Sequence, residues 1–238
     1  LGLFILPQVY TDNVFGFLAN RTDILFNYPF MHSEILYNYH CFYTCNLSIL
    51  RKSVLDLGMF NETFTGPAAE DIELGYRLWK NGYHILYIED CIAEHDHPVT
   101  LKSLCKVHDT RGYGAATLYF LHPELSIIDH FSDSSLQKMK SDDILNQDNV
   151  AKLYDKLVKY ESMELKYLTT AEVDSIYNAV KILIRHHVNK GMLRNDIIQN
   201  IAIKNSPNTE DILLTVVIPC YNYGKYLEDA VLSVIVQN

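Results

Sequence analysis

The chain has 238 residues, enough for one large domain or two small ones with a substantial apolar core. A formal net charge of −9 argues against a broad nucleic-acid surface, because phosphate binding requires clustered Lys and Arg, and no such cluster is found. Five cysteines without Cys-x-x-Cys pairs argue against a structural zinc site, and no apolar run approaches the roughly 20 residues that cross a bilayer, so a cytosolic protein is expected.

The first 60 or so residues are expected to alternate short strands and short helices. Residues 1–6 form an apolar run ended by proline, which favours a buried strand, and a short helix is expected near 15–19. Residues 41–50 alternate between apolar and polar side chains, as a half-buried strand does. A short helix over 51–57 should follow and end at Gly58.

A helix is predicted to begin directly after the Gly66-Pro67 break. Its apolar face follows the i, i+3, i+4, i+7 spacing through Asp71, Leu74, Gly75 and Leu78, and Asn81-Gly82 ends it. Glu70 and Asp71 therefore lie in the first turn, where the helix dipole favours an ionised carboxylate that can accept a proton. Helix capping alone would explain these two acidic residues equally well.

Two short strands and a long helix are expected next. Residues 84–88 and 91–95 read as strands separated by a turn at Glu89-Asp90. Residues 101–121 show helical spacing, which we expect to be interrupted at 112–114 by the Gly-Tyr-Gly sequence and to stop before Pro123.

From about residue 126 onward the chain becomes polar and its apolar positions follow a helical period. Thr169 stands three residues before Glu172, a capping box that predicts a helix start near 170. A continuous apolar run then appears at 212–218, followed by a loop and helical spacing, as in a buried parallel strand feeding a helix.

The order of these motifs resembles the acceptor-binding half of family 2 glycosyltransferases with the GT-A fold, over roughly residues 40–123. The matching elements are an Asn-x-Ser segment at 46–48, a Gly-x-Phe-Asn-Glu-x-Phe turn at 58–64, the Glu-Asp-x-Glu-Leu helix, and a later histidine. The Val-Ile-Pro-x-Tyr-Asn sequence at 217–222 is similar to the opening strand and nucleotide-contacting loop of the same family.

The resemblance implies an α/β fold, a partial GT-A mixed sheet with flanking helices followed by a helical linker. Residues 1–125 would be the acceptor-side half of one domain, 126–211 the linker, and 212–238 the first strand and helix of a second domain. The expected arrangement is a tandem glycosyltransferase represented across its junction. The acidic Asp-x-Asp stretch that holds the metal in this family is not found in the sequence.

The activity implied is inverting transfer of a sugar from a nucleotide-diphosphate sugar, UDP-linked, to an acceptor hydroxyl in polysaccharide or glycoconjugate synthesis. By position in the motif, Asp71 resembles the general base and Glu70 its neighbour that orients the acceptor. His95 resembles the ligand of a divalent metal, Mn²⁺ or Mg²⁺, with His97 as its rival.

The nucleotide is expected to contact Pro219, Tyr221 and Asn222, and Arg111 could approach its diphosphate from a Gly-flanked loop. Location is expected in the cytoplasm, with peripheral contact at the inner face of the membrane left open. The alternative function is a non-catalytic module that binds an acceptor or serves as a scaffold. The two differ in whether replacing Asp71 by Asn abolishes transfer.

Overall fold

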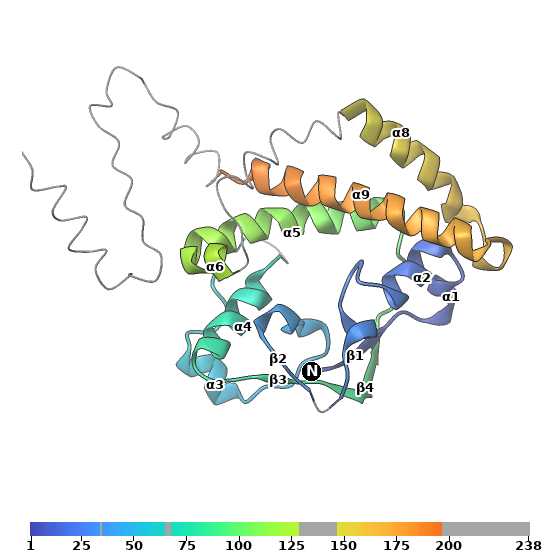
Figure 1. Ribbon diagram of the computed structural model, residues 1–238. Coiled ribbons are helices and arrows are strands. Elements are labelled where there is room, and N and C mark those ends of the chain that lie inside the picture. Colours follow the sequence, from blue (N-terminus) through green and yellow to red (C-terminus); the bar gives the residue numbers. More distant parts are fainter. Residues whose placement is uncertain (34, 65–67, 129–146, 197–238) are drawn as a thin grey trace, which may run out of the picture. The chain divides into compact units, whose positions relative to one another are not determined.

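The computed structural model describes residues 1–33, 35–64, 68–128 and 147–196 (Figure 1). All of these residues belong to one compact unit, Leu1–Gln199. The strand expected at 212–218 and the nucleotide-contacting Pro219, Tyr221 and Asn222 fall outside the described residues. The expected domain boundaries at 125 and 211 stay predictions.

The described strands form two separate pairs. Strand β1 (Gly2–Ile5) pairs in parallel with β4 (Ile88–Glu94), and β2 (Leu36–Tyr37) pairs antiparallel with β3 (Ile85–Leu86). The expected opening strand is confirmed. The mixture of helices and strands is compatible with the α/β class, although the described strands do not join into the single mixed sheet that the GT-A resemblance implies.

The turn expected at Glu89-Asp90 is wrong, because β4 runs through it. The pairing shifts from Gly2 opposite Ile88 to Leu3 opposite Ile92, so the intervening residues of β4 bulge out of the ladder. The turn-forming residues therefore produce a local irregularity inside one strand and do not separate two strands.

The strand expected over residues 41–50 is also wrong, because two 3-10 turns, η2 (Tyr39–Cys41) and η3 (Thr44–Asn46), occupy its first part. The side chain of Asn46 pairs with the neighbouring strands. Its Nδ2 donates to the carbonyl oxygens of Leu3 and Cys91, each at 2.8 Å, and so bridges β1 and β4. A side-chain amide thus supplies contacts that a strand's backbone would have made.

Helices make up most of the described chain. They are α1 (Gln8–Thr11), α2 (Val14–Arg21), α3 (Arg51–Asp56), α4 (Glu70–Lys80), α5 (Leu101–Leu121), α6 (Pro123–Ile128), α8 (Gln147–Val158) and α9 (Thr170–Arg194), with shorter 3-10 turns η1 (Tyr28–Phe30), η5 (Lys159–Ser162) and η6 (Leu165–Tyr167). The end of α4 is as predicted, since Gly82 adopts φ +84° just beyond it. The capping box at the start of α9 is confirmed: the Thr169 hydroxyl accepts from the Glu172 N–H while the Glu172 carboxylate accepts from the Thr169 N–H.

Helices α5 and α9 lie side by side along much of their length (Figure 1). The interruption expected at residues 112–114 is wrong, because α5 continues through both glycines. A Cβ on Gly112 would lie 2.0 Å from the Val188 carbonyl oxygen, and one on Gly191 would lie 1.9 Å from that of Asp109. These glycines are therefore sites of backbone contact between the two helices.

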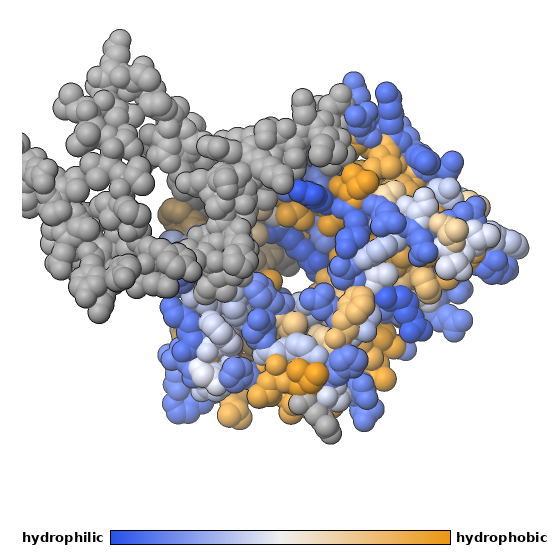
Figure 2. All heavy atoms as spheres, in the orientation of Figure 1, coloured by the Kyte–Doolittle hydropathy of each residue, from blue (hydrophilic) through white to orange (hydrophobic). Residues whose placement is uncertain are grey.

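The main core lies among α2, α5, α8 and α9. Its fully buried members are Val14, Phe15, Leu18, Leu101, Leu104, Leu157, Val180 and Leu183. A second cluster of aromatic rings, including Tyr28, Tyr43 and Tyr87, packs beside β1. Figure 2 shows apolar surface where Figure 1 places β2 and β3, and Leu36 and Leu86 are exposed there. In the part of the chain that the structure describes, no helix is both long and apolar enough to span a membrane.

Candidate functional site

The first turn of α4 is pressed against the middle of α5. Ala68 and Ala69 are buried directly before the helix, and Ala69 adopts φ +64° as the chain turns into it. A Cβ on Gly114 of α5 would lie 2.1 Å from the Ala68 carbonyl oxygen, so only glycine permits this approach. The contact fixes where the two acidic residues that follow, Glu70 and Asp71, begin.

Asp71 on α4 and Arg111 on α5 lie close enough for their charges to influence each other. Burial raises the pKa of Asp71, while a 2.8 Å hydrogen bond from the Ile72 N–H and the positive charge of Arg111 act in the opposite direction. Burial likewise lowers the pKa of Arg111, against the effect of Tyr43 and Asp71. Desolvation therefore outweighs the helix dipole on which the sequence argument relied. Asp71, a carboxylate whose pKa is raised by burial and which is influenced by the charge of Arg111, is suited to act as a general base.

Glu70 lies next to Asp71 but differs in its partners. Burial raises the pKa of Glu70, and the Asp71 charge adds to that effect. Its Oε2 atom is buried and makes no hydrogen bond within the described structure. A buried acceptor of this kind carries a desolvation cost that a bound hydroxyl group would offset.

His95 follows β4 and lies two aromatic rings away from Arg111. The guanidinium lies 5.3 Å from the centre of the Phe26 ring, Phe26 packs on Phe4 at 5.4 Å, and Phe4 packs on the His95 imidazole at 4.7 Å. His95 is exposed, its ring centre is 5.5 Å from that of His97, and burial followed by the His97 charge lowers its pKa.

The described residues do not supply a full set of ligands for the metal expected at His95. No group of three or more His, Cys, Asp or Glu side chains that could hold an ion occurs among these residues. The neighbouring Asp96 accepts a 2.6 Å hydrogen bond from the Tyr10 hydroxyl instead. His95 could supply one nitrogen ligand, and a divalent ion would need its remaining ligands from outside this part of the chain.

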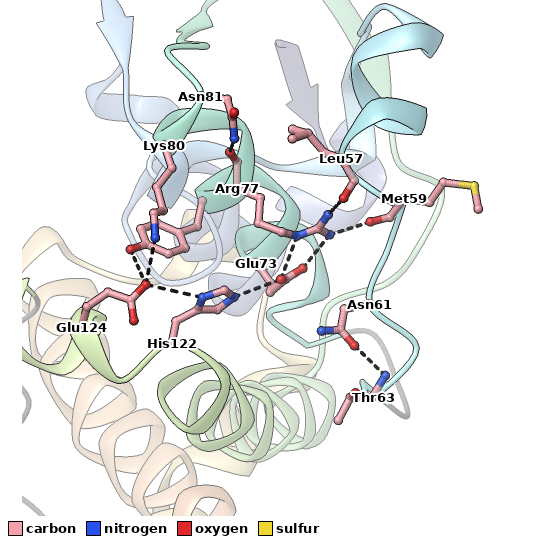
Figure 3. A network of polar contacts seen from close by, with 11 residues as sticks. Leu57, Met59, Asn61, Thr63, Glu73, Arg77, Lys80, Asn81, His122 and Glu124 are labelled. Carbon is pink, nitrogen blue, oxygen red and sulfur yellow. Dashed lines mark hydrogen bonds and ion pairs between the residues drawn. The ribbon is translucent and has the colours of Figure 1, made fainter. Parts of the chain in front are cut away.

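A polar network that the sequence pattern did not predict lies behind the first turn of α4 (Figure 3). Glu73 is 1% exposed, and its carboxylate accepts two hydrogen bonds of 2.8 Å from Nε and Nη2 of Arg77, one turn further along. Arg77 also donates to the carbonyl oxygens of Leu57 and Met59, beyond α3. The i, i+4 Glu-Arg spacing was visible in the sequence, but the long-range partners were not.

The same network reaches α5 and α6. Nε2 of His122 lies 3.0 Å from Oε1 of Glu73 (Figure 3). Oε1 of Glu124 accepts hydrogen bonds from the Tyr76 hydroxyl at 2.9 Å and from Lys80 at 3.2 Å. Its backbone hydrogen bond, with help from Tyr76 and Lys80, lowers the pKa of Glu124 to about 2. Helix α4 is thus anchored on the sides away from Asp71.

The chain is similar to a protein named as a glycosyltransferase, with 30% identity over 109 residues. That relative is "Uncharacterized glycosyltransferase YfnE" from Bacillus subtilis (strain 168), and the match covers 44% of this chain and 28% of the relative. The chain thus spans a little over a quarter of that protein's length. No family model matches the chain, and no solved structure matches it.

Proposed function

We propose that this chain is the acceptor side of a family 2 glycosyltransferase with the GT-A fold. The paired carboxylates Glu70 and Asp71 at the start of α4, with the charge of Arg111 on α5 acting on Asp71, carry the proposal. The similarity to a protein named as a glycosyltransferase supports the general class. The tandem arrangement, with 212–238 beginning a second domain, is part of the proposal.

In the proposed reaction Asp71 accepts the proton of an acceptor hydroxyl. The acceptor oxygen then forms a bond to the anomeric carbon of the donor sugar, and the bond between that carbon and the diphosphate oxygen breaks, its electron pair leaving with the UDP. Attack on the side opposite the leaving group inverts the anomeric configuration. Glu70 orients the acceptor through its unpaired Oε2 atom.

Arg111 is assigned a different role from the one its sequence suggested. Its guanidinium lies over the Phe26 ring, and its positive charge favours the ionised form of Asp71, so its proposed role is to keep the base charged. Contacts to the nucleotide are proposed for Pro219, Tyr221 and Asn222. A divalent metal, Mn²⁺ or Mg²⁺, when bound would stabilise the departing diphosphate, with His95 as one ligand. The proposed location is the cytoplasm.

The test is Asp71→Asn in a longer protein that carries this chain together with its donor-binding half, assayed by UDP release from a panel of UDP-sugars in the presence of oligosaccharide acceptors and Mn²⁺. We expect transfer to fall by about 10²-fold or more, since the base is lost. Because burial raises the pKa of Asp71, the folded chain disfavours its charged form, and an amide of the same shape should leave the fold intact. Undiminished transfer in a folded Asp71→Asn variant would contradict the proposal.

Asp56→Asn on α3 provides a matched control. This carboxylate is exposed and pairs only with Lys52 on the same helix within the described structure. Transfer by the control variant should equal that of the native protein. A comparable loss in both variants would indicate a general effect of removing acidic charge.

A further inference from the structure

A cavity of about 400 Å³ opens beside α5, the end of α9 and the two described residues Phe64 and Ala68. Its walls include Phe64, Thr110, Tyr113, Arg194 and Asp196. Ala68, three residues before Asp71, also borders it, so the cavity adjoins the first turn of α4. None of the motifs behind the family resemblance includes Arg194 or Asp196.

The end of α9 is held in place by one buried side chain. Asn195 is 0% exposed, and its Nδ2 donates to the Tyr113 carbonyl oxygen at 2.8 Å and to the Thr117 hydroxyl at 2.9 Å. Arg194 and Asp196 stand on either side of this anchor, and both border the cavity. The anchor thus fixes the backbone between Arg194 and Asp196 against α5.

The polar groups around the cavity are mixed, and their charges do not sum to a positive site. Arg194 forms an ion pair with Asp109, and its guanidinium lies 5.1 Å from the centre of the Tyr113 ring. Asp196 adds a second carboxylate, so among the described residues the lining and its ion partner carry two negative charges against one positive. Such a lining disfavours an anionic ligand.

Aromatic rings beside hydroxyl, carboxylate and guanidinium groups match the chemistry of a neutral sugar. Phe64 and Tyr113 border the cavity and carry aromatic rings, which suit the C–H face of a pyranose, and Thr110 and Asp196 border it with groups that can hydrogen-bond to sugar hydroxyls. A cavity of this volume lies in the range of small-ligand sites.

We propose that this cavity binds a neutral saccharide unit of the acceptor and directs it toward Asp71. The inference rests on the proposed glycosyltransferase function and adds to it a location, a charge class of acceptor and two selecting residues, Tyr113 and Asp196. The part of the acceptor that occupies the cavity is not the reacting hydroxyl. Its binding therefore sets affinity and selectivity, and the proton transfer stays with Asp71.

The test is saturation-transfer NMR and titration of the purified chain with cellobiose, lactose and chitobiose as neutral probes and a hyaluronan tetrasaccharide as the anionic probe. We expect at least one neutral probe to bind and the anionic probe to bind more weakly or not at all. Tyr113→Ala should weaken the neutral probe about tenfold, whereas Tyr113→Phe should retain it. Absence of binding by every neutral probe, or binding unaffected by Tyr113→Ala in a folded variant, overturns the proposal.

Reversing the charge at Asp196 tests whether this residue determines the preference for neutral over anionic saccharides. Asp196→Lys should shift preference toward the anionic tetrasaccharide. The matched control is Asp174→Lys, an exposed position on α9 about 30 Å further from the cavity at 1.5 Å per residue, and it should leave the preference unchanged. Equal shifts in both variants would mean that only the overall charge matters and would overturn the inference.

The two proposals fail in different ways. Binding of the saccharide requires neither donor nor metal, so Asp71→Asn should leave it intact. If Asp71→Asn keeps full transfer while Tyr113→Ala loses binding, the proposed mechanism fails and the cavity assignment stands. If Asp71→Asn abolishes transfer while Tyr113→Ala transfers with an unchanged acceptor KM, the mechanism stands and the cavity assignment fails.

Discussion

Removal of the Glu73 carboxylate should destabilise the fold more than any change to an exposed ion pair. In Glu73→Ala, Arg77 keeps its bonds to the Leu57 and Met59 carbonyl oxygens but loses its counter-charge. Breaking one partner of a buried pair costs about 3–5 kcal/mol. Because the Arg77 side chain is 21% exposed and can recover some hydration, we expect the lower end, about 3 kcal/mol.

The chain offers a matched control and a built-in probe. Lys52 and Asp56 have the same i, i+4 relation at 2.6 Å, but their side chains are 83% and 56% exposed, so Asp56→Ala should cost less than about 0.5 kcal/mol. The single tryptophan, Trp79, lies on the same helix as Glu73, and its fluorescence in a urea titration reports the unfolding of that helix.

In thermal unfolding, a loss of about 3 kcal/mol corresponds to a decrease in Tm of roughly 6–12 °C for a domain of this size. Glu73→Gln, which keeps the volume and loses the charge, should fall between the alanine variant and the Asp56 control. If Glu73→Ala were no more destabilising than Asp56→Ala, the network would be incidental to stability and the anchoring of α4 would need another explanation.

Two further predictions concern α5 and the helices packed against it. In a urea titration, Gly191→Ala should destabilise the folded chain by about 1–3 kcal/mol, although alanine has the better helix propensity. The reason is that the new Cβ would lie 1.9 Å from the Asp109 carbonyl oxygen. A stabilised variant would refute the close packing of α5 and α9. Arg111→Met removes the positive charge that opposes the effect of burial on Asp71, so the pKa of Asp71 should rise further. Since only the deprotonated base is active, the acid limb of the pH profile of kcat/KM should move to higher pH. An unmoved limb would show that Arg111 does not act on the base.

Local signals in the sequence predicted local structure well. The Gly82 stop of α4, the Thr169 capping box and the short helix ended by Gly58 all depend on a few adjacent residues, and each is confirmed. The failures arise where a distant partner decides. From the sequence alone, Gly112 is expected to break the helix. In the structure the Val188 carbonyl oxygen packs closely against Gly112, and the helix continues through this residue.

The candidate site shows the same division. The sequence placed Glu70 and Asp71 in a first turn, and the structure does so too. The sequence could not show that burial would have the largest effect on the pKa of Asp71. Nor could it show that the charge of Arg111, 40 residues later, would act on Asp71, because both effects depend on how α5 packs against α4. The roles assigned to these residues, and to His95, stay predictions.

The bridge that Asn46 makes between β1 and β4 limits how this residue can be modified. Asn46-Leu47-Ser48 has the form of an N-glycosylation acceptor, and the atom that would carry the glycan is Nδ2. That nitrogen already donates to Leu3 and Cys91, so a glycan would have to displace at least one of these hydrogen bonds. In any host that glycosylates secreted proteins, attachment at this position before folding would compete directly with the pairing of the two strands.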